Sequence, residues 1–166
     1  HLVWVKIGRD ELGLPDFEQV HRTYSAICAL AQNGRILAAS ALKFGGLAEA
    51  VSKMAFGNRI GVHLKDMPFD KLFMLAYGSL LIEIPASVDP EEAFSGLDYE
   101  VVGETIAEPE IRFGGCSLSI DEILSAWQEP LEPIFPTRTT QAGKVPSCSF
   151  TGKVVRKQGA RKTPIA

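Results

Sequence analysis

The pattern of apolar and polar positions predicts a chain in which strands and helices alternate. Short apolar or alternating runs predict strands over residues 2–7, 36–41, 59–65, 79–84, 99–106 and 110–113. Apolar residues at steps of three and four predict helices near residues 16–32, 46–56, 68–74, 90–95 and 120–127. This order predicts an α/β fold with mixed α+β character, in which helices pack on a mixed sheet.

Three of these elements carry more detailed expectations. The strand over residues 36–41 lacks polar alternation, which predicts burial on both faces. The strands over 99–106 and 110–113 are expected to be joined by a turn through Glu108 and Pro109. The first helix is expected to bury one apolar face, made of Phe17, Val20, Tyr24, Ile27, Cys28 and Ala31.

The composition changes after Trp127, which predicts two regions. Residues 1–129 are expected to form the α/β domain. Residues 130–166 are rich in proline, and all six charged residues after position 143 are basic. A basic end can bind nucleic acid, but this one lacks interleaved aromatic residues apart from Phe150 and follows an acidic body. A linker or tail is therefore the favoured interpretation, with no nucleic acid as partner.

The overall composition is that of a cytoplasmic globular protein of 166 residues. No apolar run approaches the roughly 20 residues that a membrane span needs, so no membrane is expected as partner. The chain begins with a strand-like run and no methionine, which indicates a segment of something longer or a processed form. Cys28, Cys116 and Cys148 are far apart and are expected to be buried free thiols.

A glycine turn between a strand and a helix is the one candidate binding site. The backbone N–H groups at a helix start lack partners and lie at the positive end of the helix dipole, so they bind phosphate well. Gly45 and Gly46 fit this geometry, and Ser40 and Lys43 could add donors. The alternative is a tight turn that needs glycine for backbone freedom alone. Neither common phosphate-loop motif is present.

No catalytic or metal-binding group stands out. The three histidines do not cluster, and no serine or cysteine lies in a nucleophile motif. Asp66, Asp70 and Glu83 are separated by apolar sequence and do not form a metal-ligand set. We therefore expect neither a catalytic residue nor a metal site in this chain.

Several segments, taken in order, resemble the phosphoribosylformylglycinamidine synthase family within the aminoimidazole ribonucleotide synthase superfamily. The resemblance rests on "YSAICALAQNGRILAAS", "GGLAEAVSKMAFGNRIGV", "KLFMLAYGSLLIEI" and "YEVVGETI". It covers most of residues 1–136 and is closest to the C-terminal domain of the second synthase-like module in the large, glutamine-dependent form. The end, "PLEPIFPTRT" and the basic stretch after it, would lead into that form's glutaminase domain.

The resemblance implies part of an ATP- and glutamine-dependent ligase of purine biosynthesis, whose substrate is formylglycinamide ribonucleotide. ATP and Mg²⁺ would serve the parent enzyme, with neither bound to this domain alone, and the module partner and the glutaminase domain would be its neighbours. Phosphate would lie at the turn formed by Ser40, Lys43, Gly45, Gly46 and Leu47.

The chain departs from the family pattern at the turn itself. The family usually reads His-Asp-x-Ser-Asp-Gly-Gly-Leu, whereas this chain has Lys43 and Phe44 before the glycines. Met74 and Leu75 stand where the family has an Asn/Ser-Glu pair. The chain is therefore expected to be inactive alone. The alternatives are a scaffold that docks neighbouring domains, or a related enzyme of the selenophosphate synthetase or thiamine-phosphate kinase type.

Overall fold

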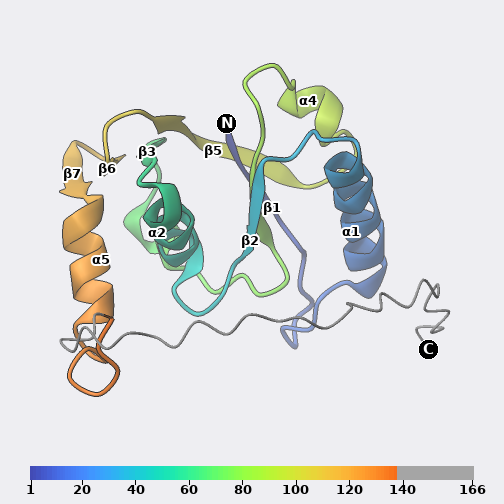
Figure 1. Cartoon of the computed structure of the whole chain (residues 1–166). Coiled ribbons are helices and arrows are strands. Elements are labelled where there is room, and N and C mark those ends of the chain that lie inside the picture. The colour runs from blue at the N-terminus through green and yellow to red at the C-terminus, as the bar shows by residue number, and fades with distance from the viewer. Residues whose placement is uncertain (138–166) are drawn as a thin grey trace, which may run out of the picture.

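A single mixed sheet of seven strands organises residues 1–137, the part of the chain that the computed structural model describes (Figure 1). The strands are β1 (Leu2–Val5), β2 (Ala38–Ala41), β3 (Gly61–Leu64), β4 (Leu80–Glu83), β5 (Tyr99–Ile106), β6 (Glu110–Phe113) and β7 (Cys116–Ser119). The helices are α1 (Phe17–Gln32), α2 (Gly46–Asn58), α3 (Phe69–Leu72), α4 (Pro90–Ala93) and α5 (Ile120–Gln128). The predicted α/β fold, a mixed sheet with helices packed on it, is confirmed.

The strands lie in the order β2-β4-β1-β5-β3-β6-β7, so most neighbours in the sheet are distant in sequence. All pairs are antiparallel except β3 and β6, which run parallel. The expected turn through Glu108 and Pro109 does not join a hairpin, because β3 lies between β5 and β6. The hairpin is formed instead by β6 and β7, whose connection uses Gly114 and Gly115 with positive φ.

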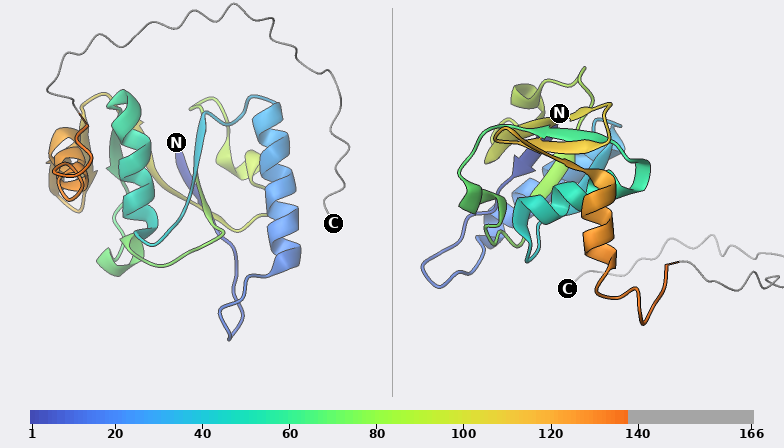
Figure 2. Two further views of the ribbon diagram at one scale, coloured as in Figure 1. Left: turned by 60° about the horizontal axis from the view of Figure 1, so that its bottom comes forward. Right: turned by 90° about the vertical axis from the view of Figure 1, so that its left-hand side faces the viewer.

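Helices cover both faces of the sheet, and two hydrophobic cores result. Alternate residues of β1 face opposite sides: Leu2 and Trp4 enter the core beneath α2, and Val3 and Val5 enter the core beneath α1 and α4. Figure 1 shows β1 and β2 between α2 and α1, and both views of Figure 2 show α5 beside the α2 end of the sheet. Helix α2 thus packs lengthwise against one face of the sheet, through Leu47, Ala50 and Val51.

Side-chain caps fix where the predicted helices begin. The Asp16 carboxylate accepts hydrogen bonds from the first turn of α1, and Asp89 does the same for the short α4. Ser119 and Glu122 form a reciprocal capping box at the start of α5. These caps confirm the helix starts that the sequence indicated.

Two details of burial differ from expectation. Strand β2 is at the edge of the sheet, so its residues alternate between half-buried and exposed instead of being buried on both faces. The buried residues of α1 are Thr23, Ile27 and Leu30. The predicted apolar face of this helix is therefore wrong in most positions: Ile27 is buried and Val20 half-buried, but Phe17, Tyr24, Cys28 and Ala31 are exposed. Cys116 is exposed as well, on the outermost strand, and Cys148 lies outside the described residues. The expectation of buried thiols is therefore wrong for the two that the structure describes.

Helix α5 ends at Gln128, and residues 130–137 form turns without a further helix or strand. The rest of the predicted linker, residues 138–166, lies outside the described residues. The boundary between positions 129 and 130 therefore stays a prediction. None of the described helices combines the length and the apolar character needed to cross a membrane.

Candidate functional site

The glycine turn lies between the edge strand β2 and the first turn of α2. The Leu42 N–H donates to the Ser79 carbonyl at 3.0 Å, which fastens the turn to the segment preceding β4. The Gly46 N–H donates to the Lys43 carbonyl, also at 3.0 Å, and closes the turn on itself. The chain thus reverses from strand to helix within four residues, Leu42 to Gly45.

Glycine is required at position 46 for two reasons. Its φ is +64°, in the left-handed region that side chains disfavour. A Cβ there would lie 2.7 Å from the Leu72 carbonyl oxygen and 2.9 Å from the Met74 carbonyl oxygen. The turn is therefore pressed against the segment after α3, which the resemblance also assigns to the site.

The amide of Gly45 already has an anionic partner within the chain. The Glu49 Oε2 atom accepts its N–H at 2.8 Å, so a carboxylate from the first turn of α2 lies where the sequence predicts a phosphate. The carboxylate gains from the positive end of the helix dipole as a phosphate would. Since the Gly46 N–H is bonded to Lys43, both glycine amides are used internally.

A lysine one helical turn further on completes this arrangement. The Lys53 ammonium forms an ion pair with the other oxygen of Glu49, at the i,i+4 spacing that suits a helix surface. The hydrogen bond from Lys53, followed by that from the Gly45 amide, lowers the pKa of the Glu49 carboxyl below its usual range. Glu49 is therefore ionised at neutral pH and fixed over the turn by two donors.

The residues predicted to bind phosphate have different environments. Ser40 is half-buried on β2 opposite Leu81, Lys43 is exposed, and Leu47 is completely buried in the core. The structure brings Lys43, Gly45 and Gly46 together at the turn, and Leu47 can contribute only its backbone there. Glu49 was not among the predicted residues. Its signal in the sequence was an acidic residue in the first helical turn, three positions after the second glycine.

Large apolar side chains surround the turn and are exposed to solvent. We call Phe44, Phe69, Phe73, Met74 and Leu75 the turn patch; their exposed fractions run from 48% to 78%. The rings of Phe69 and Phe73 lie 5.1 Å apart, centroid to centroid. Three members, Phe44, Met74 and Leu75, stand where the family resemblance implies polar or acidic residues. An exposed apolar cluster of this kind is typical of a surface that another domain or protein covers.

A groove of about 810 Å³ continues from the turn patch across the same face. Its walls come from α2, α3, the β6–β7 hairpin and α5, and they are mainly apolar. Trp127 of α5 is 56% exposed, and its ring packs against that of Phe56 with the two centroids 5.6 Å apart. The Lys53 ammonium lies over the Trp127 ring in a cation–π contact. Glu49 and Lys53 therefore lie between the glycine turn and an open apolar surface.

The turn does not fit a magnesium ion. Mg²⁺ binds through oxygen ligands, usually one or two carboxylates, and the nearby Glu49 carboxylate is occupied by Lys53 and the Gly45 amide. Among residues 1–137 no three His, Cys, Asp or Glu side chains lie close enough together to hold a metal. No metal-dependent step is derived for this domain.

Comparison with solved structures shows which known fold the chain shares. Solved structures of PurL from T. maritima share the fold: the complex with formylglycinamide ribonucleotide (FGAR) superposes with a TM-score of 0.60 at 14% identity, over 74% of this chain and 27% of that one. The complex with AMPPCP superposes at 0.58 and 16% identity, over 72% and 24%. A HypE–HypF complex gives 0.51 at 15% identity, over 71% and 51%. The chain thus shares the α/β fold of these solved structures.

The sequence is also similar to two curated PurL subunits. The chain is 30% identical, over 135 residues, to phosphoribosylformylglycinamidine synthase subunit PurL of Thermoplasma acidophilum, and 26% identical over 133 residues to that of Deinococcus radiodurans. These matches cover 73% and 72% of this chain, and no protein-family model matches it. The resemblance seen in the sequence is confirmed: the chain is a PurL-like domain. It spans only 17% and 18% of the length of these relatives.

Proposed function

We propose that the chain serves as one domain of a cytoplasmic, ATP- and glutamine-dependent ligase that converts formylglycinamide ribonucleotide to its amidine. The similarity to PurL subunits supports the reaction class, and the T. maritima structures with FGAR and ATP support the ligands. ATP and Mg²⁺ would act in the parent enzyme, held by its other domains. Whether the parent is the large form, with this chain in its second module, stays a prediction.

One observation carries the more specific part of the proposal, which is that this domain contributes structure and no chemistry of its own. Glu49 occupies the Gly45 amide at 2.8 Å, so the turn is filled by its own chain. Phosphate binding at Ser40, Lys43, Gly45, Gly46 and Leu47 stays a prediction, and it requires that Glu49 move away. The scaffold role is thus favoured over the phosphate-facing role.

The turn patch and the groove beside it give the scaffold a docking surface. We propose that another domain of the same polypeptide covers them, the module partner being the first candidate and the glutaminase domain the second. The relatives are more than five times as long as the matched segment, so a parent of similar length would have further domains that could cover the groove. A covering domain would also remove the exposed aromatic rings from water, which stabilises an interface by roughly 25 cal/mol for each Å² of apolar surface.

The decisive experiment measures amidine formation from formylglycinamide ribonucleotide, ATP and glutamine. We expect turnover by the full-length parent polypeptide and none by the 166-residue chain. A parent carrying Phe73→Asp should lose at least tenfold in activity, because a charge would be buried in the domain interface.

Leu12→Asp is the matched control, since Leu12 is 84% exposed in the loop before α1 and is not a member of the turn patch, and it should leave activity within twofold. Turnover by the isolated chain would refute the scaffold role. An inactive parent that folds and binds its substrates would refute the reaction.

A further inference from the structure

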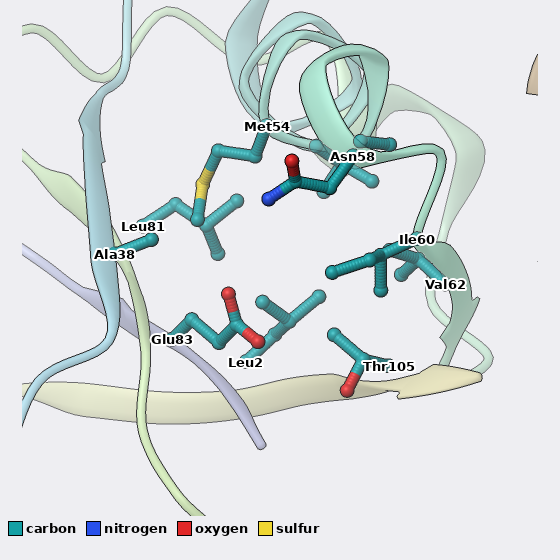
Figure 3. Close-up of a pocket in the computed structure, with 11 residues that line it drawn as sticks. Leu2, Ala38, Met54, Asn58, Ile60, Val62, Leu81, Glu83 and Thr105 are labelled. Atoms are coloured by element: carbon teal, nitrogen blue, oxygen red, sulfur yellow. The ribbon is translucent and has the colours of Figure 1, made fainter. Parts of the chain in front are cut away.

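A smaller pocket lies at the other end of α2, on the side of the sheet that this helix covers (Figure 3). Its volume is about 90 Å³. Apolar side chains form most of its wall, among them Leu2, Met54 and Leu81. Three polar side chains also line it: Asn58, the last residue of α2; Glu83 at the end of β4; and Thr105 on β5.

The sheet register sends the Glu83 side chain into this pocket. Glu83 pairs with Leu2 on one side and with Ala38 on the other. Side chains of a strand alternate between faces, so Glu83 shares the face of Leu81, which is completely buried in the core beneath α2. Figure 3 shows Glu83 and Asn58 pointing toward one another from opposite walls, with the Met54 thioether beside them.

None of the polar side chains in the pocket has a partner within residues 1–137. Glu83, Asn58 and Thr105 make no side-chain hydrogen bond, and Glu83 takes part in no ion pair there. A carboxylate that is half-buried against Leu81 and Met54 loses hydration without compensation. Its position therefore favours a ligand that supplies positive charge and hydrogen-bond donors.

The end of α2 adds to this preference. Carbonyl groups of the last helical turn lack partners in the helix and form the negative end of its dipole. Helix α2 has 13 residues and ends at Asn58, directly above the pocket. The Glu83 carboxylate and the helix end together offer acceptors to one cationic group.

We propose that this pocket binds a small primary ammonium group that carries a short apolar chain. The ammonium, with three N–H donors, would bind Glu83, and its carbon chain would pack on Met54 and Leu81. The volume is about three times the ~30 Å³ that one water takes up in the liquid, which suits a few non-hydrogen atoms. A divalent metal suits the pocket less well, because its wall is mainly apolar and Glu83 belongs to no group of three His, Cys, Asp or Glu side chains in residues 1–137 that could hold one.

Titration of the 166-residue chain with n-propylammonium chloride tests the proposal, followed by amide chemical shifts in NMR. We expect saturable shifts at residues around Asn58 and Glu83, with millimolar affinity. Glu83→Gln keeps the shape of the side chain and removes its charge, and should weaken binding at least tenfold. 1-Propanol, of the same size and without charge, should also bind at least tenfold more weakly.

Glu104→Gln is the matched control, because it also removes one strand carboxylate but Glu104 is exposed on β5 and outside the pocket. The affinity of the Glu104→Gln chain for n-propylammonium should stay within twofold of that of the unsubstituted chain. Equal binding of n-propylammonium by the Glu83→Gln chain, equal binding of 1-propanol, or no saturable binding would each overturn the proposal.

The same ammonium chemistry could come from a free amine or from a lysine side chain. We assign a free amine, because a pocket of about 90 Å³ is a poor match for an entire lysine arm with its backbone. Nα-acetyl-lysine methylamide is the comparison probe. Weaker binding than n-propylammonium supports the free amine, and binding at least tenfold tighter would overturn that assignment in favour of a lysine.

Discussion

The two ends of helix α2 differ in how their charges are satisfied. At the first turn, Glu49 accepts the Gly45 N–H and pairs with Lys53. An acid, a lysine and a glycine amide within the nine residues 45–53 therefore satisfy one another. At the last turn, Glu83 and Asn58 point toward one another with no bonded partner among the described residues. The charged groups at the first end of α2 are all paired without a ligand, whereas those at the second end are not.

This difference separates structural glycine turns from binding sites. A strand, two glycines and a helix start are common to both, so the motif alone does not decide between them. What decides is whether the chain supplies its own anion, and here Glu49 does. An unsatisfied charge held in place by rigid elements is the better guide to a ligand than a familiar motif.

The largest effect is expected from Gly46→Ala, which tests whether the first end depends on close backbone contact. The new Cβ would overlap the carbonyl oxygens of Leu72 and Met74 and would need a left-handed backbone. We expect the free energy of unfolding to fall by about 3 kcal/mol, measured by urea denaturation. Gly57→Ala, in the same helix with nothing within 4 Å of its Cβ, should instead stabilise by about 0.5 kcal/mol. Equal effects of the two substitutions would contradict the close packing of the turn.

Most of the fold follows from local patterns, and the errors have physical causes. All five helices and six of the seven strands were predicted, because periodicity and caps are encoded within a few residues. Strand β7 was missed, because it is only four residues long and its last residue, Ser119, is also the N-cap of α5. The insertion of β3 between β5 and β6 depends on pairing over distance in sequence, which no local pattern reports.

A middle-sized effect is expected from Glu49→Gln, which removes the charge at the first end. Because the folded-state pKa of Glu49 is lowered, its carboxylate stabilises the fold above its unfolded pKa near 4.5, and this contribution is lost as pH falls through the lower folded value. We expect the substitution to cost about 1 kcal/mol at pH 7 and progressively less as the pH falls below 4.5. Urea denaturation at pH 7 and at a series of acidic pH values measures the difference; a cost that does not change with pH would contradict the assignment.

The Glu49→Gln chain also tests the predicted phosphate site. If the turn binds anions once an amide replaces the Glu49 carboxylate, inorganic phosphate should shift the Gly45 and Gly46 amide resonances in this variant. It should not shift them in the unsubstituted chain. Shifts of equal size in both chains would mean that Glu49 does not block the site.

The candidate site could be predicted only in part. Gly45 and Gly46 were found because glycine pairs before a helix are visible in the sequence, and Glu49 could have been found from its four-residue spacing. Glu83 was noticed only as an isolated acid, since its nearness to Asn58 arises from the packing of α2 on β4, which brings together residues 25 positions apart. Sites assembled by the sheet become visible only with the fold.

The smallest effect is expected from Glu83→Gln, and its sign distinguishes the two ends of α2. An amide loses less hydration than a carboxylate when half-buried, so this substitution should leave stability unchanged or raise it by about 0.5 kcal/mol, opposite to Glu49→Gln.

The same substitution should also remove the effect of the amine. Added n-propylammonium at ten times its dissociation constant should stabilise the unsubstituted chain by about 1.4 kcal/mol and the Glu83→Gln chain by much less. Urea denaturation with and without the amine measures both quantities, and Glu104→Gln should respond as the parent chain does. A Glu83→Gln chain that is clearly less stable without any ligand would show that the carboxylate is already satisfied inside the fold, and the contrast between the two helix ends would disappear.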